Sequence, residues 1–312
     1  MRVLFMGTPE LARTVLISLC EAGHEIVAAV TQPDKEKGRG KTLQASPVKE
    51  EAVRRGIPVL QPRRLKNPEE QAALQAFLEE NPADVGVVAA FGQILPQAVL
   101  DMPRNGCLNV HASLLPKYRG ASPIQQTILE GEAESGVTIM QMDAGLDTGD
   151  ILLQEAIPLS PEETGDSLEE KLADLGGRLI AEALALLEEG RLSPQPQSGD
   201  TCYAGMIRKE QGQIDWAAPA EMIERKIRAF APWPSAYTFR NGKRLQIWKA
   251  ALAEGREGAA PGFVTAVTKK DFTVQAGDGA LRILRVQPEG KKEMEADAYL
   301  RGYPLQEGDR LG

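Results

Sequence analysis

The residues best suited to chemistry lie in the segment Cys107-Leu108-Asn109-Val110-His111, which contains one of only two histidines in 312 residues. Side chains two positions apart on a β-strand project from the same face. Asn109 and His111 would therefore share one face, and Leu108 and Val110 would share the other. An amide and an imidazole can donate hydrogen bonds to a developing negative charge and move protons. The alternation predicts a strand with one apolar face and one face that carries an active site.

A carboxylate partner for His111 is expected in the segment 143–150, Asp-Ala-Gly-Leu-Asp-Thr-Gly-Asp, which lies between two apolar runs. These runs are typical of consecutive strands, which would bring the loop between them close to the histidine. The residues alone leave Asp143 and Asp150 open as alternatives to Asp147. The second histidine, His24, follows a glycine between an expected helix and an expected strand, and we interpret it as a structural residue of a turn.

Composition and charge limit the class of protein. Hydrophobic residues make up 42% and charged residues 26%, which are ordinary values for a soluble globular chain. No stretch of about twenty apolar residues is present, so we expect a cytoplasmic protein with no membrane partner. The three cysteines are far apart and form no Cys-x-x-Cys motif, and with two histidines we expect no metal. The sequence also lacks the glycine-rich loops that bind dinucleotides and ATP, and it lacks a Gly-x-Ser-x-Gly nucleophile motif.

Charge is divided unevenly along the chain. The net charge is −8, yet from Met206 onward 18 Lys and Arg face 14 Asp and Glu, a net charge of +4. The positive charge of the C-terminal part would therefore allow it to bind the phosphates of a nucleic acid. Five basic residues there fit an electrostatic track for a nucleic acid, with ordinary surface charge as the alternative: Arg240, Lys243, Arg244, Lys269 and Lys270.

The first part of the chain alternates short apolar strands with amphipathic helices, which is typical of a parallel sheet covered on both faces. Strands are expected at 2–6, 25–30, 84–89, 107–110, 136–142 and 151–157, and helices at 10–21, 47–55, 69–80, 123–129 and 167–189. We expect a catalytic domain over 1–190, a linker over 191–205 and a second domain over 206–312. In the second domain, a helix at 221–229 precedes strands at 245–250, 262–267, 272–276 and 281–286, which suggest a small β-barrel.

Three motifs together resemble the folate-dependent formyltransferases: Asn109-x-His111, Ser113-Leu114-Leu115-Pro116-x-x-Arg119-Gly120 and Gly145-Leu146-Asp147-Thr148-Gly149-Asp150. Five more segments resemble the members of that family that act on a transfer RNA: 7–9, 31–34, 38–41, 91–96 and 227–234. The matching motifs run from residue 7 to residue 234. The strands that follow agree with the family's C-terminal domain in architecture more than in motif.

The resemblance implies the formyltransferase fold, a Rossmann-like mostly parallel sheet followed by an OB-like barrel that binds tRNA. It also implies transfer of the formyl group of 10-formyltetrahydrofolate to the α-amine of initiator methionyl-tRNA, by a monomer without a metal. In the family pattern Asn109 donates a hydrogen bond to the oxyanion of the tetrahedral intermediate, His111 stabilises that charge and passes protons, and Asp147 orients His111. Because these side chains include no nucleophile, transfer would be direct.

The resemblance assigns binding residues as well. Folate contacts are expected from two loops, Phe91, Gly92, Gln93, Ile94 and Leu95 in one and Ser113, Leu114, Leu115 and Pro116 in the other. Contacts with tRNA are expected from an exposed basic loop over 34–41, at Lys37, Arg39 and Lys41. Two other readings remain: a related enzyme that formylates a small molecule or hydrolyses formylfolate, and a non-enzymatic binding protein.

Overall fold

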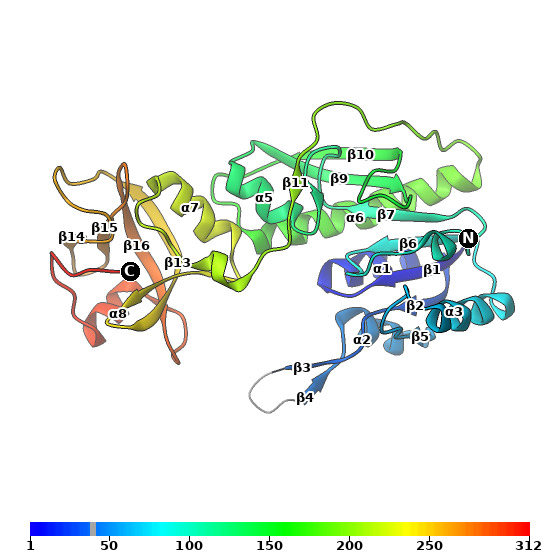
Figure 1. Cartoon of the computed structure of the whole chain (residues 1–312), viewed down its shortest axis with the longest axis horizontal. Helices are drawn as coiled ribbons and strands as arrows, with labels where there is room; N and C mark the ends of the chain where they lie inside the picture. The colour runs from blue at the N-terminus through cyan, green and yellow to red at the C-terminus, as the bar shows by residue number, and fades with distance from the viewer. Residues whose placement is uncertain (38–41) are drawn as a thin grey trace. The chain divides into compact units, whose positions relative to one another are not determined.

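The computed structural model describes residues 1–37 and 42–312, and the chain forms two compact units (Figure 1). The N-terminal unit comprises residues 1–123, 134–158 and 169–205, and the C-terminal unit comprises residues 124–133, 159–168 and 206–312. The segment 191–205 groups with the N-terminal unit. The expected boundaries at residues 190 and 205 stay a prediction about how the chain is organised into domains.

The N-terminal unit is built on a seven-stranded sheet with the order β10-β9-β7-β6-β1-β2-β5. Its strands are β1 (Arg2–Gly7), β2 (Glu25–Val30), β5 (Val59–Leu60), β6 (Val85–Ala89), β7 (Cys107–His111), β9 (Glu134–Gln141) and β10 (Ile151–Pro158). The five strands β5, β2, β1, β6 and β7 pair in parallel with their neighbours in the sheet. β9 pairs antiparallel with both β7 and β10. The predicted α/β class with a mostly parallel sheet is therefore confirmed.

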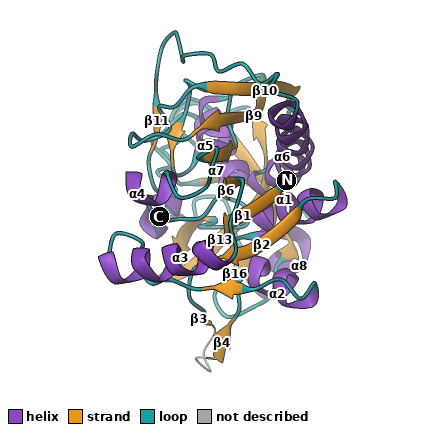
Figure 2. Ribbon diagram, turned by 90° about the vertical axis from the view of Figure 1, so that its right-hand side faces the viewer, coloured by secondary structure: helices purple, strands orange, loops and turns teal. Residues whose placement is uncertain are grey.

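Helices cover both faces of this sheet (Figure 2). They are α1 (Glu10–Glu21), α2 (Pro47–Arg54), α3 (Pro68–Glu80), α4 (Gln97–Leu100) and α6 (Gly165–Glu188). On one face, Leu4 and Met6 of β1 share a buried cluster with Leu74 and Leu78 of α3. On the other face α6 packs so closely that a Cβ at Gly176 would lie 2.6 Å from Val110 of β7. The alternation along β1 and β7 thus follows the two faces, as a strand period of two requires.

Two short pairings depart from the sequence-based expectation. The segment expected as an exposed loop over 34–41 begins instead as a strand, because β3 (Lys35–Lys37) pairs antiparallel with β4 (Thr42–Gln44). Farther along, β8 (Arg119–Gly120) pairs in parallel with β11 (Tyr203–Ala204). Strands of two or three residues are too short to show a periodic pattern, so the sequence gives no signal for them.

The C-terminal unit contains an antiparallel sheet with the order β12-β13-β16-β15-β14, and β17 pairs with β16. Its elements are α5 (Pro123–Glu130), which begins one residue before the unit, η1 (Lys209–Gly212), α7 (Ala220–Ala229), β12 (Ala236–Arg240), β13 (Lys243–Ala253), β14 (Val264–Val267), β15 (Phe272–Gln275), β16 (Ala280–Pro288), β17 (Met294–Glu295) and α8 (Ala296–Gly302). Ile223 and Ile227 of α7 share a buried cluster with Phe272 and Ile283 of the sheet. Closure of this sheet into a barrel stays a prediction, because β12 and β14 are the two ends of the described strand path.

Across residues 1–37 and 42–312, the search for membrane-spanning segments finds no helix of sufficient length and apolarity.

Candidate active site

The interior strand β7 presents Asn109 and His111 from one face. Asn109 pairs with Val88 of β6 and Met140 of β9, so it lies inside the sheet. The two side chains are nearly buried, with Asn109 9% and His111 6% exposed. Among the described residues, no side chain or backbone group hydrogen-bonds to the Asn109 amide, which leaves its N–H groups available to a ligand.

The imidazole of His111 is held by a backbone carbonyl. Its Nε2 lies 3.0 Å from the carbonyl oxygen of Tyr118. Because a carbonyl oxygen only accepts, this hydrogen bond requires the proton to be on Nε2. The other nitrogen, Nδ1, faces Oδ2 of Asp147 at 3.8 Å, which is an electrostatic contact rather than a hydrogen bond. Nδ1 is therefore the nitrogen that can exchange a proton with a substrate, and it does so beside a carboxylate.

Asp147 is the single carboxylate within 4.0 Å of this ring in the described part of the chain. Its Oδ2 accepts a hydrogen bond of 2.7 Å from the backbone N–H of Gly120, and its backbone adopts a left-handed φ of 52°. Asp143 has a different task, because its Oδ1 accepts from the backbone N–H of Gly145 at 2.9 Å and from the Thr148 hydroxyl at 2.7 Å. The geometry thus separates a carboxylate that faces His111 from one that stabilises the turn.

The loop that carries Asp147 folds back along β7. β9 is antiparallel to β7, and its last residue, Gln141, lies opposite Leu108 near the beginning of β7. The loop must therefore return by several residues to reach His111. A Cβ at Gly149 would lie 1.7 Å from the carbonyl oxygen of Gln141, so only glycine permits this close return.

The loop 112–118, which contains the first set of residues expected to bind folate, is held by hydrogen bonds from β9 and β10. Thr138 of β9 donates its hydroxyl to the Ser113 carbonyl at 2.6 Å and accepts from the Leu115 N–H at 3.1 Å. Gln154 of β10 donates to the Leu115 carbonyl at 3.0 Å. The Ser113 hydroxyl donates to the Lys117 carbonyl at 2.7 Å and is buried, so it stabilises the loop itself. Of the four residues expected to bind folate in this loop, Leu114 and Pro116 are partly exposed, whereas Ser113 and Leu115 are buried.

The second loop expected to bind folate, 91–95, follows β6 at the same edge of the sheet. Phe91 and Leu95 are buried, and the Phe91 carbonyl accepts from the side chains of Thr8 and Gln32, each at 3.1 Å. The side chain of Gln93 is bonded to the backbone of Leu65 and Pro62. Gly92 has a φ of 78°, which suits glycine. Ile94, 65% exposed, is the member of this set that presents a large side chain to solvent.

Sequence reasoning missed Tyr118, Thr138 and Gln154 as supports of the site. Thr138 did carry a signal, because it stands within the apolar run 137–140, and a buried polar side chain needs a hydrogen-bond partner. Gln154 carried no such signal, because it is exposed and another polar residue, Glu155, follows it in β10. Tyr118 acts through its backbone carbonyl, so its side chain could not reveal its role.

His24 has the structural environment expected from the sequence. Its Nδ1 lies 3.3 Å from the amino group of Met1. Burial, followed by the positive charge of that amino group, lowers the pKa of His24. In the described part of the chain, no group of three or more His, Cys, Asp or Glu side chains is arranged to hold a metal ion.

Of the three residues expected to contact tRNA, one lies among the described residues. The backbone of Lys37 lies in β3, while Arg39 and Lys41 lie outside the described residues. In the C-terminal unit, two of the five basic residues of the expected track have internal roles. Arg240 donates to the carbonyls of Tyr303 at 3.1 Å and of Pro304, and the guanidinium of Arg244 lies 3.8 Å above the ring of Tyr237. Lys243, Lys269 and Lys270 are exposed.

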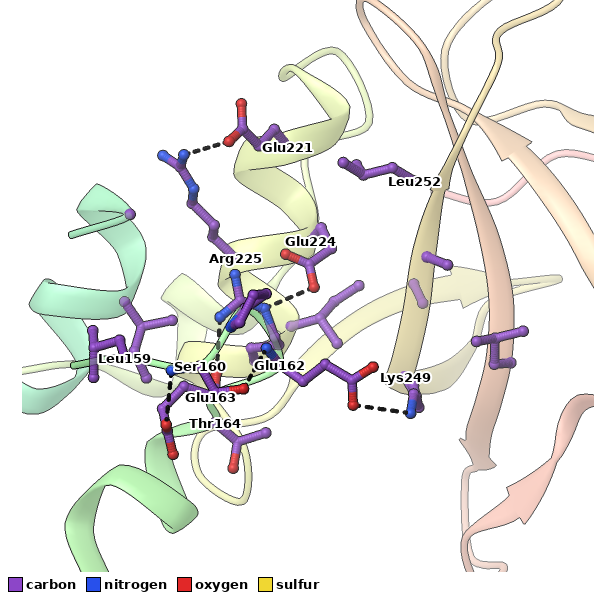
Figure 3. A pocket seen from close by; sticks show the side chains of 18 of the residues that line it. Leu159, Ser160, Glu162, Glu163, Thr164, Glu221, Glu224, Arg225, Lys249 and Leu252 are labelled. Carbon is purple, nitrogen blue, oxygen red and sulfur yellow. Dashed lines mark hydrogen bonds and ion pairs between the residues drawn. The ribbon is translucent and has the colours of Figure 1, made fainter. Parts of the chain in front are cut away.

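A hollow of about 980 Å³ lies within the C-terminal unit, lined by α7, residues 159–164, β13 and β16 (Figure 3). Several of its charged side chains pair with one another, as in Arg228 with Glu224 at 2.7 Å and Lys249 with Glu162 at 3.8 Å. None of the residues predicted for catalysis or folate binding lines it. The hollow therefore lies apart from the predicted site, and the charges of these pairs neutralise one another.

Comparison with known proteins places these features in a family. Residues 1–184 match the family profile described as formyl transferase, and residues 206–304 match the formyl transferase C-terminal domain. The chain is 48% identical to a methionyl-tRNA formyltransferase of Agathobacter rectalis over 99% of this chain and 98% of that protein. It is 51% identical to the methionyl-tRNA formyltransferase of Delftia acidovorans over 99% of this chain and 96% of that protein.

Two solved structures have a similar fold at low sequence identity. HypX from Aquifex aeolicus in complex with tetrahydrofolic acid superposes with a TM-score of 0.65 at 19% identity. The superposition covers 100% of this chain and 50% of that protein. WlaRD, a sugar 3N-formyl transferase, superposes with a TM-score of 0.65 at 21% identity over 94% of this chain and 99% of that protein. These likenesses concern the fold of the chain.

Proposed function

This chain belongs to the methionyl-tRNA formyltransferase family, and we propose that Asn109, His111 and Asp147 carry out its reaction. The enzyme transfers the formyl group of formyltetrahydrofolate to the amino group of methionyl-tRNA. The donor in this proposal is 10-formyltetrahydrofolate and the acceptor is the initiator tRNA, as the family motifs imply. The observation that carries the assignment is the convergence of Asn109, His111 and Asp147 on one face of β7.

Formyl transfer makes three demands on a site. The attacking amine must lose a proton, the formyl oxygen must be stabilised as it gains negative charge, and the folate nitrogen must receive a proton as it leaves. Within residues 1–37 and 42–312 the Asn109 amide has no hydrogen-bond partner, so its N–H donors suit the oxygen. Nδ1 of His111 is the ring nitrogen free to take up and return a proton, because Nε2 is bonded to the Tyr118 carbonyl. The carboxylate of Asp147 stabilises the positive charge that the ring then carries.

The transfer is direct in this proposal. No stable acyl intermediate would form in this arrangement on Asn109, His111 or Asp147. The Ser113 hydroxyl is not available as a nucleophile, because it donates a hydrogen bond to the Lys117 carbonyl. The amine of the methionine would thus attack the formyl carbon itself, and the site would stabilise the tetrahedral arrangement that follows.

The loops beside these residues suit a folate. Ile94 and Leu146 are large apolar side chains that are 65% and 54% exposed, on the loops that follow β6 and β9. A pterin is flat and has apolar faces, so side chains of this kind would cover it. The low exposure of Asn109 and His111 would also limit the access of water to the reacting groups.

The tRNA contacts remain a proposal from the family motifs. Lys37, Arg39 and Lys41 are basic residues suited to phosphate. Replacing Arg39 and Lys41 together by Ala should weaken methionyl-tRNA binding and flatten the dependence of log affinity on log salt by roughly one unit per lost contact, with folate affinity preserved. An unchanged slope and affinity would exclude these residues as phosphate contacts.

The test of the catalytic assignment is a formyl-transfer assay with purified protein, 10-formyltetrahydrofolate and methionyl-tRNA. Free methionine and glycinamide ribonucleotide serve as competing acceptors, and transfer should go to the charged tRNA alone. His111→Ala should lower turnover by about 10² to 10⁴ while folate binding is kept. His24→Ala is the matched control, because it removes the other histidine, and it should turn over like the wild type. Near-normal turnover of a folded His111→Ala protein would refute the assignment.

A further inference from the structure

We propose that Gln197 is a positioning residue that holds Asp147 in place beside the ring of His111. The inference rests on the proposed function, because it assigns Gln197 a task through the carboxylate of that site. Gln197 comes from the segment 191–205, which the sequence suggested was a linker, 50 residues beyond Asp147.

The side-chain amide of Gln197 bridges two segments of the site. Its Oε1 accepts from the Arg119 guanidinium, at 2.6 Å from Nη2 and 3.1 Å from Nε. Its Nε2 donates to the backbone carbonyls of Asp147 and Gly149, each at 2.8 Å. A guanidinium only donates and a carbonyl only accepts, so the orientation of the amide is fixed by its partners. Both donors and the acceptor of Gln197 are thereby committed to the site.

These bonds tie Asp147 to the same short segment that holds His111. The carbonyl of Tyr118 bonds to the ring of His111, the side chain of Arg119 bonds to Gln197, and the N–H of Gly120 bonds to the carboxylate of Asp147. These three consecutive residues therefore hold both the imidazole of His111 and the carboxylate of Asp147. Gln197 closes the arrangement, because it fixes the backbone of Asp147 while Gly120 fixes its side chain.

The loop that carries Asp147 has a strained backbone, which hydrogen bonds from outside the loop can stabilise. Asp147 adopts a left-handed φ of 52°, which a non-glycine residue adopts at an energetic cost. Hydrogen bonds to the carbonyls on both sides of Thr148 would oppose relaxation of this backbone. The 3.8 Å separation of Asp147 from His111 is not itself bridged by a hydrogen bond, so it depends on such indirect restraints.

Gln197 is itself delivered by a fixed segment. On one side, Gln195 and Ile151 exchange two backbone hydrogen bonds of 2.8 Å. On the other side, the Arg119 N–H donates to the Cys202 carbonyl at 3.0 Å, and β11 pairs with β8. Because the segment is anchored on both sides by its backbone, removal of the Gln197 side chain should leave the fold intact and release only the Asp147 loop.

The first experiment compares Gln197→Ala with Gln197→Glu in formyl transfer to methionyl-tRNA. Gln197→Ala should lower kcat by about 10-fold to 100-fold with KM for both substrates nearly unchanged, because misplacing a catalytic group by about 1 Å costs up to 10². Gln197→Glu keeps the contact with Arg119 but turns a carboxylate toward two carbonyl oxygens, so it should be at least as slow. Restored activity in Gln197→Glu would overturn the proposal, since only the Arg119 contact would then matter.

The matched control is Gln195→Ala. This glutamine lies two residues away in the same segment and is exposed. Among the residues that the structure describes, its side chain makes one hydrogen bond, of 3.3 Å to the Ser193 hydroxyl. It should retain wild-type kcat. Histidine NMR supplies a second readout, because the chain has two histidines. In Gln197→Ala the His111 signals should move at constant pH, while the signals of His24 remain in place and report that the protein is folded. Unmoved His111 signals would count against the proposal.

A double-substitution cycle separates this inference from the proposed function. If Gln197 acts through Asp147, Gln197→Ala should slow an Asp147→Asn enzyme by no more than about twofold. Full activity of Asp147→Asn alone would refute the proposed function. A slow Asp147→Asn enzyme that Gln197→Ala slows further by its whole factor, or an unaffected kcat in the single Gln197→Ala variant, would overturn only the inference about Gln197.

Discussion

Replacement of Asp147 by Asn removes one charge from the site with little change of shape. Asn retains an oxygen that can accept the 2.7 Å hydrogen bond from the Gly120 N–H, so the loop can keep its position. What is lost is the negative charge 3.8 Å from Nδ1 of His111. The substitution therefore tests whether the carboxylate stabilises a positive imidazole during formyl transfer.

The separation of the two groups sets the size of the effect. Two unit charges at this distance interact by about 4 kcal/mol at an effective dielectric constant of about 20. The side chains are 6% and 14% exposed for His111 and Asp147, so water screens the pair only in part. Since about 1.4 kcal/mol corresponds to a factor of ten, the full interaction is worth up to roughly 10³ in rate. We expect kcat to fall by about 10² to 10³.

The assay is formyl transfer to methionyl-tRNA at saturating folate, with circular dichroism and folate binding measured on the same preparations. Asp143→Asn is the matched control, because it makes the same chemical change in the same loop. An amide oxygen at that position can still accept from Gly145 and Thr148, so turnover should stay within about threefold of the wild type. Equal effects of the two substitutions, or turnover of Asp147→Asn close to wild type, would refute the reasoning.

Three further predictions follow from other contacts. Arg54 and Arg55 hold the pKa of Glu51 down from 4.5 to about 2, so the stability this pairing contributes is present above pH 4.5 and is lost as the pH falls toward 2. The melting temperature of Glu51→Gln should thus be lower than that of the wild type at pH 7, with the difference closing near pH 2. Gly149→Ala should lower kcat at least about tenfold, because its Cβ would meet the Gln141 carbonyl, whereas Gly302→Ala, with open space around it, should be neutral in the same assay. Burial raises the pKa of the Cys107 thiol to about 12, so a thiol reagent should label Cys107 only when denaturant unfolds the protein. Cys20 and Cys202 are partly exposed, so the label must be assigned by peptide mapping, and labelling of Cys107 itself in the native protein would contradict its burial.

The sequence determined much of the framework because the framework depends on short-range periodicity. The helix expected at 10–21 is α1 with the same limits, and the strand expected at 25–30 is β2. Alternation with a period of two placed Asn109 and His111 on one face of β7 and Val110 on the other, where α6 packs. Each of these features is encoded within about ten residues of chain, so it can be recognised from local pattern alone.

The arrangement of the site was decided by contacts between segments that are far apart in the chain. The segment 143–150 left three aspartates open as partners of His111. The distinction among them arises from a loop that folds back along β7, with Gly149 against Gln141 and Gly120 bonded to Asp147. The carbonyl of Tyr118 and the side chain of Gln197 complete that arrangement, and neither residue belongs to a pattern that marks it. A hydrogen bond depends on the distance and direction between two groups, which the register of the sheet and the path of each loop determine. Local sequence specifies which groups are available, and only the tertiary structure specifies which of them meet.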